Sequence, residues 1–225
     1  MLPSQTVENY LKTIYLAQSA AADMEALVPM GQLAAALGVV PGTATTMMKA
    51  LAESGLVRYE PYMGVRLTPS GEKLATLVLR RHRLIELFLV RVLGMSWAEV
   101  HDEAEQLEHA VSERLIDRID DMLGRPAVDP HGDPIPTAEG TVAQNDDVDL
   151  MAAPLEVPHR VTRIVDQGPE FLRFIEDHEL MPDQVIVVQE RDALADAIRL
   201  RSASGRETTL GTRTASKVLV RPLQS

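Results

Sequence analysis

The stretch VHDEAEQLEH, residues 100–109, places six ionisable side chains in ten positions. Its composition is typical of a helix, because it lacks Gly and Pro and consists mostly of good helix formers. At about 100° per residue, one stripe of that helix carries two imidazoles and two carboxylates, from His101, Glu105, Glu108 and His109. Such a stripe is either a solvated charged face or a set of ligands for a divalent metal ion.

A second pair of this kind lies in the preceding apolar run, HRLIELFLVRVL. His82 and Glu86 stand four residues apart, so both face one side of a helix otherwise built mainly from Leu, Ile, Phe and Val. A His–Glu pair at the helix surface would explain them, but a carboxylate in such a run is costly to bury unless it is paired or bound to metal. The two patterns together favour a metal site shared by two helices.

If the two helices pack antiparallel, they can hold two ions. The available ligands are His82, Glu86 and His101 for one ion, and Glu105, Glu108 and His109 for the other. The chain has no cysteine, which excludes disulfides and thiolate ligands. Carboxylate and imidazole ligands suit Mn²⁺ or Fe²⁺, and Zn²⁺, Co²⁺ or Cd²⁺ can occupy the same positions.

The elements that would position these side chains begin with a compact series near the N-terminus. In order, they are a helix over 7–18, a short helix over 30–37 closed by Gly38, a turn at Pro41 and Gly42 with Thr43 as a helix cap, a helix over 45–54, and two short strands at 56–61 and 64–69. The strands flank a tip that contains a glycine, which is typical of a hairpin. This order predicts a winged helix-turn-helix, a fold that binds DNA.

The third helix of this series would be the recognition helix. Hydroxyls suit phosphate oxygens and base edges, and cationic side chains suit phosphates. The candidate DNA contacts are Thr43, Thr45, Thr46 and Lys49 on the helix, with Arg58 and Arg66 on the hairpin. A plain polar helix face, with Met47, Met48 and Leu51 in the core, is the alternative. Tight binding requires two half-sites, so we expect a homodimer on a palindromic double-stranded operator.

The rest of the chain is first helical and then rich in strands. Two long helices are expected over 71–94 and 96–124, the second opened by a capping box of Ser96 and Glu99. A Pro- and Gly-rich boundary over 125–140 and a linker over 145–158 follow. Alternating runs then predict a small barrel-like domain, with strands at 159–166, 184–191, 197–203, 206–211 and 216–222 and one helix over 169–180. His159 and His178 are expected at its surface.

Charge and hydropathy limit the function. The net charge of −11 excludes a protein coated in basic nucleic-acid-binding surface. Residues 1–81 nevertheless contain seven Lys/Arg against six Asp/Glu, whereas the remainder contains fifteen against twenty-seven. Contact with DNA is therefore expected in the first third. We also expect a cytoplasmic protein without a membrane span, because the chain has neither a leader pattern nor an apolar run of about 18 residues.

Taken together, these motifs resemble the metal-dependent repressors of the diphtheria toxin repressor and manganese transport regulator family. VENYLKTIYLA resembles the family's first helix, and residues 40–75 resemble its winged helix. RRHRLIELFL and VHDEAEQLEHAVSE resemble its metal-binding and dimerisation helices, DPHGDPIP the turn that follows, and PEFLRFIEDHELMPD the start of its C-terminal domain. The resemblance implies a mainly α chain with a small β-rich C-terminal domain. Its expected parts are a DNA-binding domain over 1–75, a helical metal-binding and dimerisation domain over 76–152, and an SH3-like (FeoA-like) domain over 153–225.

The resemblance also implies two metal sites. The ancillary site would use His82, Glu86, His101 and a donor from the SH3-like domain, for which Glu170 is the candidate with Gln167 behind it, and Asp129 and His131 are other possible donors. The regulatory site would use Asn9, Glu105, Glu108 and His109. Glu105 replaces the Cys of the iron-responsive branch, which favours Mn²⁺. Asn9 replaces Asp or Met, and Lys12 stands where some manganese regulators have Glu, so two separate sites are expected rather than one coupled cluster.

The function implied is a manganese-responsive transcriptional regulator that binds operators as a metal-loaded homodimer. An iron-responsive regulator of the same family is the first alternative, and a winged-helix regulator that senses an organic ligand is the second. A metalloenzyme is the third, because residues 105–109 are one substitution from the HxxEH pattern of inverted zinc proteases. No hydrolytic base accompanies that pattern, so we expect no enzymatic activity.

Overall fold

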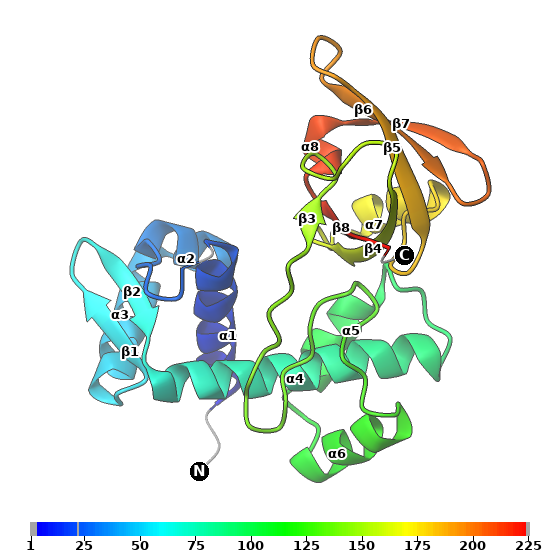
Figure 1. Ribbon diagram of the computed structural model, residues 1–225. Coiled ribbons are helices and arrows are strands. Elements are labelled where there is room, and N and C mark those ends of the chain that lie inside the picture. Colours follow the sequence, from blue (N-terminus) through cyan, green and yellow to red (C-terminus); the bar gives the residue numbers. More distant parts are fainter. Residues whose placement is uncertain (1–3, 22, 224–225) are drawn as a thin grey trace. The chain divides into compact units, whose positions relative to one another are not determined.

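A computed structural model describes residues 4–21 and 23–223 (Figure 1). The chain divides into two units. The winged-helix unit comprises Met1–His82, Glu108–Ala110 and Pro136–Val142, and the helix–barrel unit comprises Arg83–Leu107, Val111–Ile135 and Ala143–Ser225. Helix α4, Pro69–Arg91, contributes to both units. No described helix combines the length and apolar character needed to cross a membrane.

The winged-helix unit confirms the predicted order of helices and hairpin. Its elements are α1 (Gln5–Ala20), α2 (Met30–Ala36), α3 (Pro41–Glu53), β1 (Val57–Glu60), β2 (Gly64–Leu67) and the first part of α4. The two strands pair antiparallel, with Arg58 opposite Arg66. The core of this unit is mainly aliphatic and includes Leu11, Leu33 and Met48, which are fully buried.

The predicted start of α3 is wrong. The helix begins at Pro41 rather than after it, and Val40 is the N-cap, so Thr43 lies inside the helix and does not cap it. The reason is that the fixed φ of proline suits the first helical position, where its missing N–H would have no helical acceptor.

The helix–barrel unit begins with the second part of α4 and continues with α5 (Val100–Leu107) and α6 (Glu113–Met122). A single helix was expected over 96–124, and that expectation is wrong at both its start and its middle. Ser112 interrupts the helix because its hydroxyl caps α6 by accepting the N–H of Leu115. The expected capping box does not form, because Ser96 Oγ accepts the N–H of Ala98 and α5 begins only at Val100.

The C-terminal part forms a six-stranded antiparallel sheet in the order β3-β8-β4-β5-β6-β7. The strands are β3 (Val148–Asp149), β4 (Pro158–Ile164), β5 (Val185–Asp192), β6 (Ala197–Ser202), β7 (Glu207–Gly211) and β8 (Val218–Pro222), with helices α7 (Pro169–Asp177) and α8 (Thr212–Ala215). All five predicted strands and the predicted helix are confirmed. β3 lies in the segment that was expected to be a linker, and α8 was not predicted.

The sheet packs onto two loops of the same unit. Trp97 and Ala98, which precede α5, belong to the core of the barrel, and Trp97 Nε1 donates to a Glu176 carboxylate oxygen at 3.1 Å. The second loop contains Gly132, whose φ is +88°; a Cβ there would lie 1.9 Å from the carbonyl oxygen of Thr162. Only glycine allows this close approach, so the DPHGDP loop fits tightly against β4.

The predicted surface position of His159 is also wrong. Its side chain is completely buried, and Nδ1 donates to the Val157 carbonyl oxygen at 2.7 Å. His159 occupies an inward position of the alternating strand β4, where periodicity would place an apolar residue. His178 is half-buried, because its ring packs against Phe174 with 4.0 Å between the ring centroids.

Candidate metal centre

A buried cluster of ionisable groups occupies the winged-helix unit. This Glu108 cluster consists of Glu8, Lys12, Arg81, His82, Glu108 and His109. Glu108 is fully buried; its Oε1 accepts from Lys12 Nζ at 2.7 Å and its Oε2 lies 2.7 Å from His82 Nδ1. Burial raises the pKa of Glu108, but the hydrogen bond from His82 and the charge of Lys12 outweigh it and hold the pKa below its usual value. Glu108 is therefore an anion at neutral pH.

Glu8 organises the other side of the cluster. One of its carboxylate oxygens accepts from Arg81 at 2.7 Å, and the other lies 2.6 Å from His109 Nδ1. Because a carboxylate only accepts, Nδ1 of His109 carries the proton. The other ring nitrogen, Nε2, is buried, lies 3.2 Å from Glu108 Oε1 and has no hydrogen-bond partner among the described residues. A carboxylate that orients an imidazole in this way is typical of metal-binding histidines.

Asn9 supplies a second unsatisfied acceptor. Its Oδ1 is buried and has no hydrogen-bond partner among residues that the structure describes, while its backbone carbonyl accepts from Thr13. Buried acceptors without a donor are rare, and a cation satisfies them as a donor would. Two of the predicted regulatory ligands, Asn9 and His109, therefore fit a divalent ion on the evidence of their own surroundings.

The helix–barrel unit holds the other predicted ligands. Glu86 is buried, with Oε1 3.3 Å from His101 Nδ1, and His101 Nε2 lies 3.9 Å from a Glu105 carboxylate oxygen. The i,i+4 spacing thus brings His101 and Glu105 together as predicted. Glu170 is exposed in the first turn of α7 and joins none of the described clusters of potential metal ligands. Gln167 donates to an Asp133 carboxylate oxygen instead.

The predicted ligands are divided between the two units. Of the regulatory ligands, Asn9, Glu108 and His109 belong to the winged-helix unit and Glu105 to the helix–barrel unit. Of the ancillary ligands, only His82 belongs to the winged-helix unit.

Sequence reasoning missed Glu8 and Arg81. A signal was present, because Glu8 lies one turn before Leu11 on the buried stripe of α1, where a charge requires a partner. Arg81 similarly lies within the continuously buried part of α4. The sequence alone did not show that these two charges pair.

The candidate DNA contacts lie on the surface of the winged-helix unit, but they differ in exposure and in their partners. Thr43, Thr46, Lys49 and Arg58 are exposed, and Thr45 is half-buried. The hydroxyls of Thr45 and Thr46 donate to the carbonyl oxygens of Pro41 and Gly42, at 2.9 and 3.0 Å. Arg66 pairs with Glu25, so it is the least available of the six.

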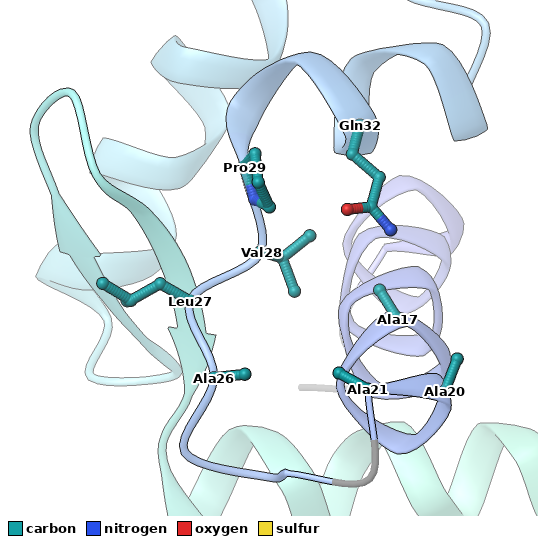
Figure 2. A pocket seen from close by; sticks show the side chains of 8 residues that line it. All are labelled: Ala17, Ala20, Ala21, Ala26, Leu27, Val28, Pro29 and Gln32. Carbon is teal, nitrogen blue, oxygen red and sulfur yellow. The ribbon is translucent and has the colours of Figure 1, made fainter.

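A cavity of about 280 Å³ also lies in the winged-helix unit, between the end of α1 and the start of α2. Figure 2 shows its lining of small apolar side chains, among which Gln32 is the only polar one. Ligand sites usually enclose more space and offer several polar groups. The cavity therefore gives little support to a regulator that senses an organic ligand.

Comparison with known proteins identifies the class. The model of the iron-dependent repressor N-terminal DNA-binding domain matches residues 3–65. The model of the iron-dependent repressor metal-binding and dimerisation domain matches residues 68–137, and that of the FeoA domain matches residues 148–222. The three matches cover most of the chain in the predicted order.

Curated relatives agree. The chain is 37% identical over 116 residues to an HTH-type transcriptional regulator of Methanocaldococcus jannaschii, a match that covers 52% of this chain and 90% of the relative. It is 34% identical over 122 residues to the regulator MntR of Lysinibacillus sphaericus, covering 54% and 84%. It is 36% identical over 132 residues to the iron-dependent repressor IdeR of Mycobacterium tuberculosis, covering 58% and 55%.

Solved structures match over nearly the whole length. A manganese-dependent transcriptional repressor in complex with manganese has a TM-score of 0.86 and 41% identity, covering 96% of this chain and all of that one. ScaR with bound Zn²⁺ and with bound Cd²⁺ gives TM-scores of 0.78 and 0.80 at 30% and 29% identity, covering 98% of this chain and all of theirs. The chain belongs to the diphtheria toxin repressor and manganese transport regulator family of metal-dependent, DNA-binding transcriptional repressors, and this is not a family of enzymes.

Proposed function

We propose that this member of the family is a manganese-responsive repressor that binds a palindromic operator as a metal-loaded homodimer. The observation that carries the proposal is the donor set. The chain has no cysteine, and the position that resembles the family's selective ligand is Glu105. Oxygen and imidazole donors suit Mn²⁺, whereas a thiolate favours softer and later metals. An iron-responsive repressor remains the second candidate, because IdeR is among the relatives.

The proposed ligands are those of the sequence analysis. The regulatory site would use Asn9, Glu105, Glu108 and His109, and the ancillary site would use His82, Glu86, His101 and Glu170. The unsatisfied acceptors of Asn9 and His109 support the first set, and the buried Glu86 beside His101 supports the second. Glu170 has the weakest support, since it is exposed.

The mechanism follows from linkage. A metal ion shifts the protein toward DNA binding only if it binds the DNA-competent arrangement more tightly than the alternative. Ligands from α1 and from the end of α5 would let one ion restrict the DNA-binding domain, proposed as residues 1–75, relative to the dimerisation domain, proposed as residues 76–152. Bound metal also neutralises carboxylates, which eases the approach of an acidic protein to DNA.

Exposed side chains support the proposed dimerisation and DNA contact. Several large apolar side chains of the helix–barrel unit are exposed, among them Val92, Leu93, Leu115 and Met122. Burial of such side chains in a second copy would explain them. The proposed DNA contacts are Thr43, Thr45, Thr46, Lys49, Arg58 and Arg66, and the proposed accessory domain is residues 153–225. Such a repressor would act in the cytoplasm, where its operators are.

The test replaces Glu105 with cysteine. An operator is first selected from a random duplex pool in the presence of Mn²⁺, and its affinity is measured against Mn²⁺, Fe²⁺, Co²⁺, Zn²⁺ and Cd²⁺ at fixed salt under reducing, anaerobic conditions. Mn²⁺ is expected to activate the wild type, and Glu105→Cys is expected to shift activation toward Fe²⁺, Co²⁺ or Zn²⁺.

Glu103→Cys, which adds a thiol at an exposed position of the same helix, is the control and is expected to keep the wild-type order. If Glu105→Cys also keeps that order, Glu105 is not the selectivity ligand. If Fe²⁺ activates the wild type best, the iron-responsive candidate replaces the proposal.

A further inference from the structure

The tip of the hairpin in the winged-helix unit carries exposed apolar side chains. Pro61, Tyr62 and Met63 connect β1 to β2, and all three are exposed. Tyr62 is fully exposed, so its ring packs on no described part of the chain, and the Met63 side chain beside it is 65% exposed. Neighbouring apolar side chains that stand out from a surface in this way are typical of a contact with a partner.

The backbone holds Tyr62 in a conformation that a bulky residue rarely adopts. Its φ is +66°, in the left-handed region. The N–H of Met63 donates to the carbonyl oxygen of Glu60 at 3.1 Å, so residues 60–63 form a tight turn. Proline at the second position and a positive φ at the third are typical of a type II turn, where the third residue is usually Gly or Asn. Tyrosine at this position adds strain, and its exposed ring gives the fold no burial that would offset it.

The tip is nevertheless firmly attached to the unit. Val28 and Val65 exchange two backbone hydrogen bonds, at 2.8 and 3.0 Å, so the hairpin is bound to the segment that precedes α2. Gly64 packs on the same segment, because a Cβ there would lie 2.5 Å from the carbonyl oxygen of Val28. A tip held in this way loses little conformational freedom when it binds a partner.

The surroundings of the tip favour DNA as this partner. The hairpin lies within the part of the chain that matches the DNA-binding domain model, and β1 packs against α3, the proposed recognition helix. Arg58, a proposed DNA contact, is exposed on β1. Residues 61–63 themselves carry no charge, and the exposed neighbour Glu60 is an acid, so the tip does not suit phosphates. Apolar side chains of this kind instead suit the minor groove, where they act as wedges.

We propose that Tyr62 and Met63 enter the minor groove of the operator, next to the major-groove segment that α3 contacts. The Tyr62 ring would pack on deoxyriboses and base edges, and Met63 would fill the groove beside it. Such a contact depends on the width and deformability of the groove, so it would favour particular base pairs outside the segment that α3 contacts. The inference rests on the proposed operator binding and adds two residues to the DNA contacts proposed above.

The experiment uses the full chain, the operator selected as described above, and the ion that activates the wild type best. The variants are Tyr62→Gly, which suits the positive φ, Met63→Ser, and Tyr62→Phe, which keeps the ring. Leu194→Ser is the control, because it removes a fully exposed apolar side chain from the loop between β5 and β6. Operator affinity is measured at several salt concentrations, and hydroxyl-radical cleavage maps the protected deoxyriboses.

We expect Tyr62→Gly to lower operator affinity about tenfold and Met63→Ser about threefold, with an unchanged salt dependence because no phosphate contact is lost. Both variants should lose protection at the same deoxyriboses, whereas Tyr62→Phe and Leu194→Ser should match the wild type. The urea midpoint of Tyr62→Gly should not fall, since glycine suits the turn, and this separates the loss of a contact from the loss of the fold.

Wild-type affinity and protection in Tyr62→Gly would overturn the proposal. A Tyr62→Phe protein as weak as Tyr62→Gly would assign the contact to the hydroxyl group and a phosphate, and would overturn the minor-groove contact. Dissociation of the Tyr62→Gly dimer in analytical ultracentrifugation, with unchanged protection, would assign the tip to a second copy of the chain instead. Activation by Fe²⁺, or an operator without palindromic symmetry, would correct the proposed function but not this inference, because every variant is compared on the duplex that the wild type selects. A wild type that selects no duplex would overturn both.

Discussion

Glu108 and Asp129 are both buried carboxylates, but among the described residues they have different partners. Glu108 accepts from Lys12 at 2.7 Å and lies equally close to His82, and its pKa is lowered. Asp129 has backbone donors on one oxygen, no hydrogen-bond donor on the other, and a raised pKa. The first carboxylate has two close partners that hold its pKa down, whereas Arg83 Nε lies 3.7 Å from Asp129 Oδ2 and its charge does not outweigh the effect of burial.

The difference has consequences for metal binding. At the Glu108 cluster an incoming ion must compete with cations that are already in place. Part of its binding free energy therefore goes into rearranging these cations, so the site can act as a switch. Asp129 shows the alternative, because its raised pKa favours the protonated, uncharged carboxyl group rather than a protein cation as the means of offsetting burial. The two buried carboxylates therefore differ in what offsets their burial: Glu108 has cationic partners, whereas Asp129 has a raised pKa.

The largest effect is expected for Glu108→Gln. Removal of the charge leaves Lys12 and His82 buried with one carboxylate fewer, which typically costs about 3–5 kcal/mol in the free energy of unfolding. The variant also loses a proposed regulatory ligand, so Mn²⁺ should no longer stimulate operator binding by the folded dimer. Urea denaturation followed by circular dichroism, and operator binding with and without Mn²⁺, measure the two effects.

The matched control for this variant is Glu103→Gln, at an exposed position of α5. It should change the free energy of unfolding by less than about 0.5 kcal/mol, as surface substitutions usually do. A Glu108→Gln protein that keeps both wild-type stability and a full Mn²⁺ response would show that the Glu108 cluster is neither balanced by pairing nor regulatory.

A smaller effect is expected for Lys12→Gln. The ammonium group lies 2.7 Å from Glu108 Oε1, where it repels a second cation. Two unit charges about 4 Å apart interact by roughly 1–4 kcal/mol between bulk water and a protein surface, so we expect Mn²⁺ affinity at the regulatory site to rise about tenfold, or about 1.4 kcal/mol. Metal-buffered titrations of operator binding would show the shift.

Lys73→Gln, an exposed substitution on α4, is the control for Lys12→Gln and should leave the Mn²⁺ midpoint unchanged. If Lys12→Gln weakens the response, Lys12 supports the site rather than competing with the ion. The proposed contrast between Glu108 and Asp129 would then be wrong for Glu108.

Sequence reasoning was most successful where the relevant contacts are local. The i,i+4 spacing predicted that His101 and Glu105 share a face, and alternation predicted five strands and the helix of the barrel. Helix ends were less predictable. Ser112 is the N-cap of α6 and Pro41 is the first residue of α3, but the continuous apolar pattern around each residue did not reveal these roles.

The pairing of distant charges could not be read from the chain. Glu8 and His109 are 101 residues apart, so no local spacing marks them as a pair. Periodicity tells which face of a helix is buried, but it does not tell which other element covers that face. Asp129 and His131 were named as possible donors from their types alone; their burial and their missing partners required the fold.

The smallest expected effect is a difference in pH dependence, and it tests the contrast most directly. In metal-free protein the folded pKa of Asp129 is raised, so above the unfolded value of about 3.9 the folded chain holds a proton that the unfolded chain lacks. Its contribution to the free energy of unfolding therefore falls as pH rises through that window, by at most about 1.4 kcal/mol per pH unit. Asp129→Asn removes this slope, so the variant should gain stability relative to the wild type as pH rises.

Glu108 has a lowered folded pKa, so its contribution is present at neutral pH and is lost as pH falls below about 4.3. Glu108→Gln should therefore lose stability relative to the wild type as pH rises. Urea unfolding between about pH 3 and 7 in the presence of a chelator, followed by Trp97 emission for Asp129→Asn and by circular dichroism for Glu108→Gln, measures both differences. Differences that change with the same sign in the two variants would mean that the burial of the two carboxylates is offset in the same way, and the contrast between Glu108 and Asp129 would lose its electrostatic basis.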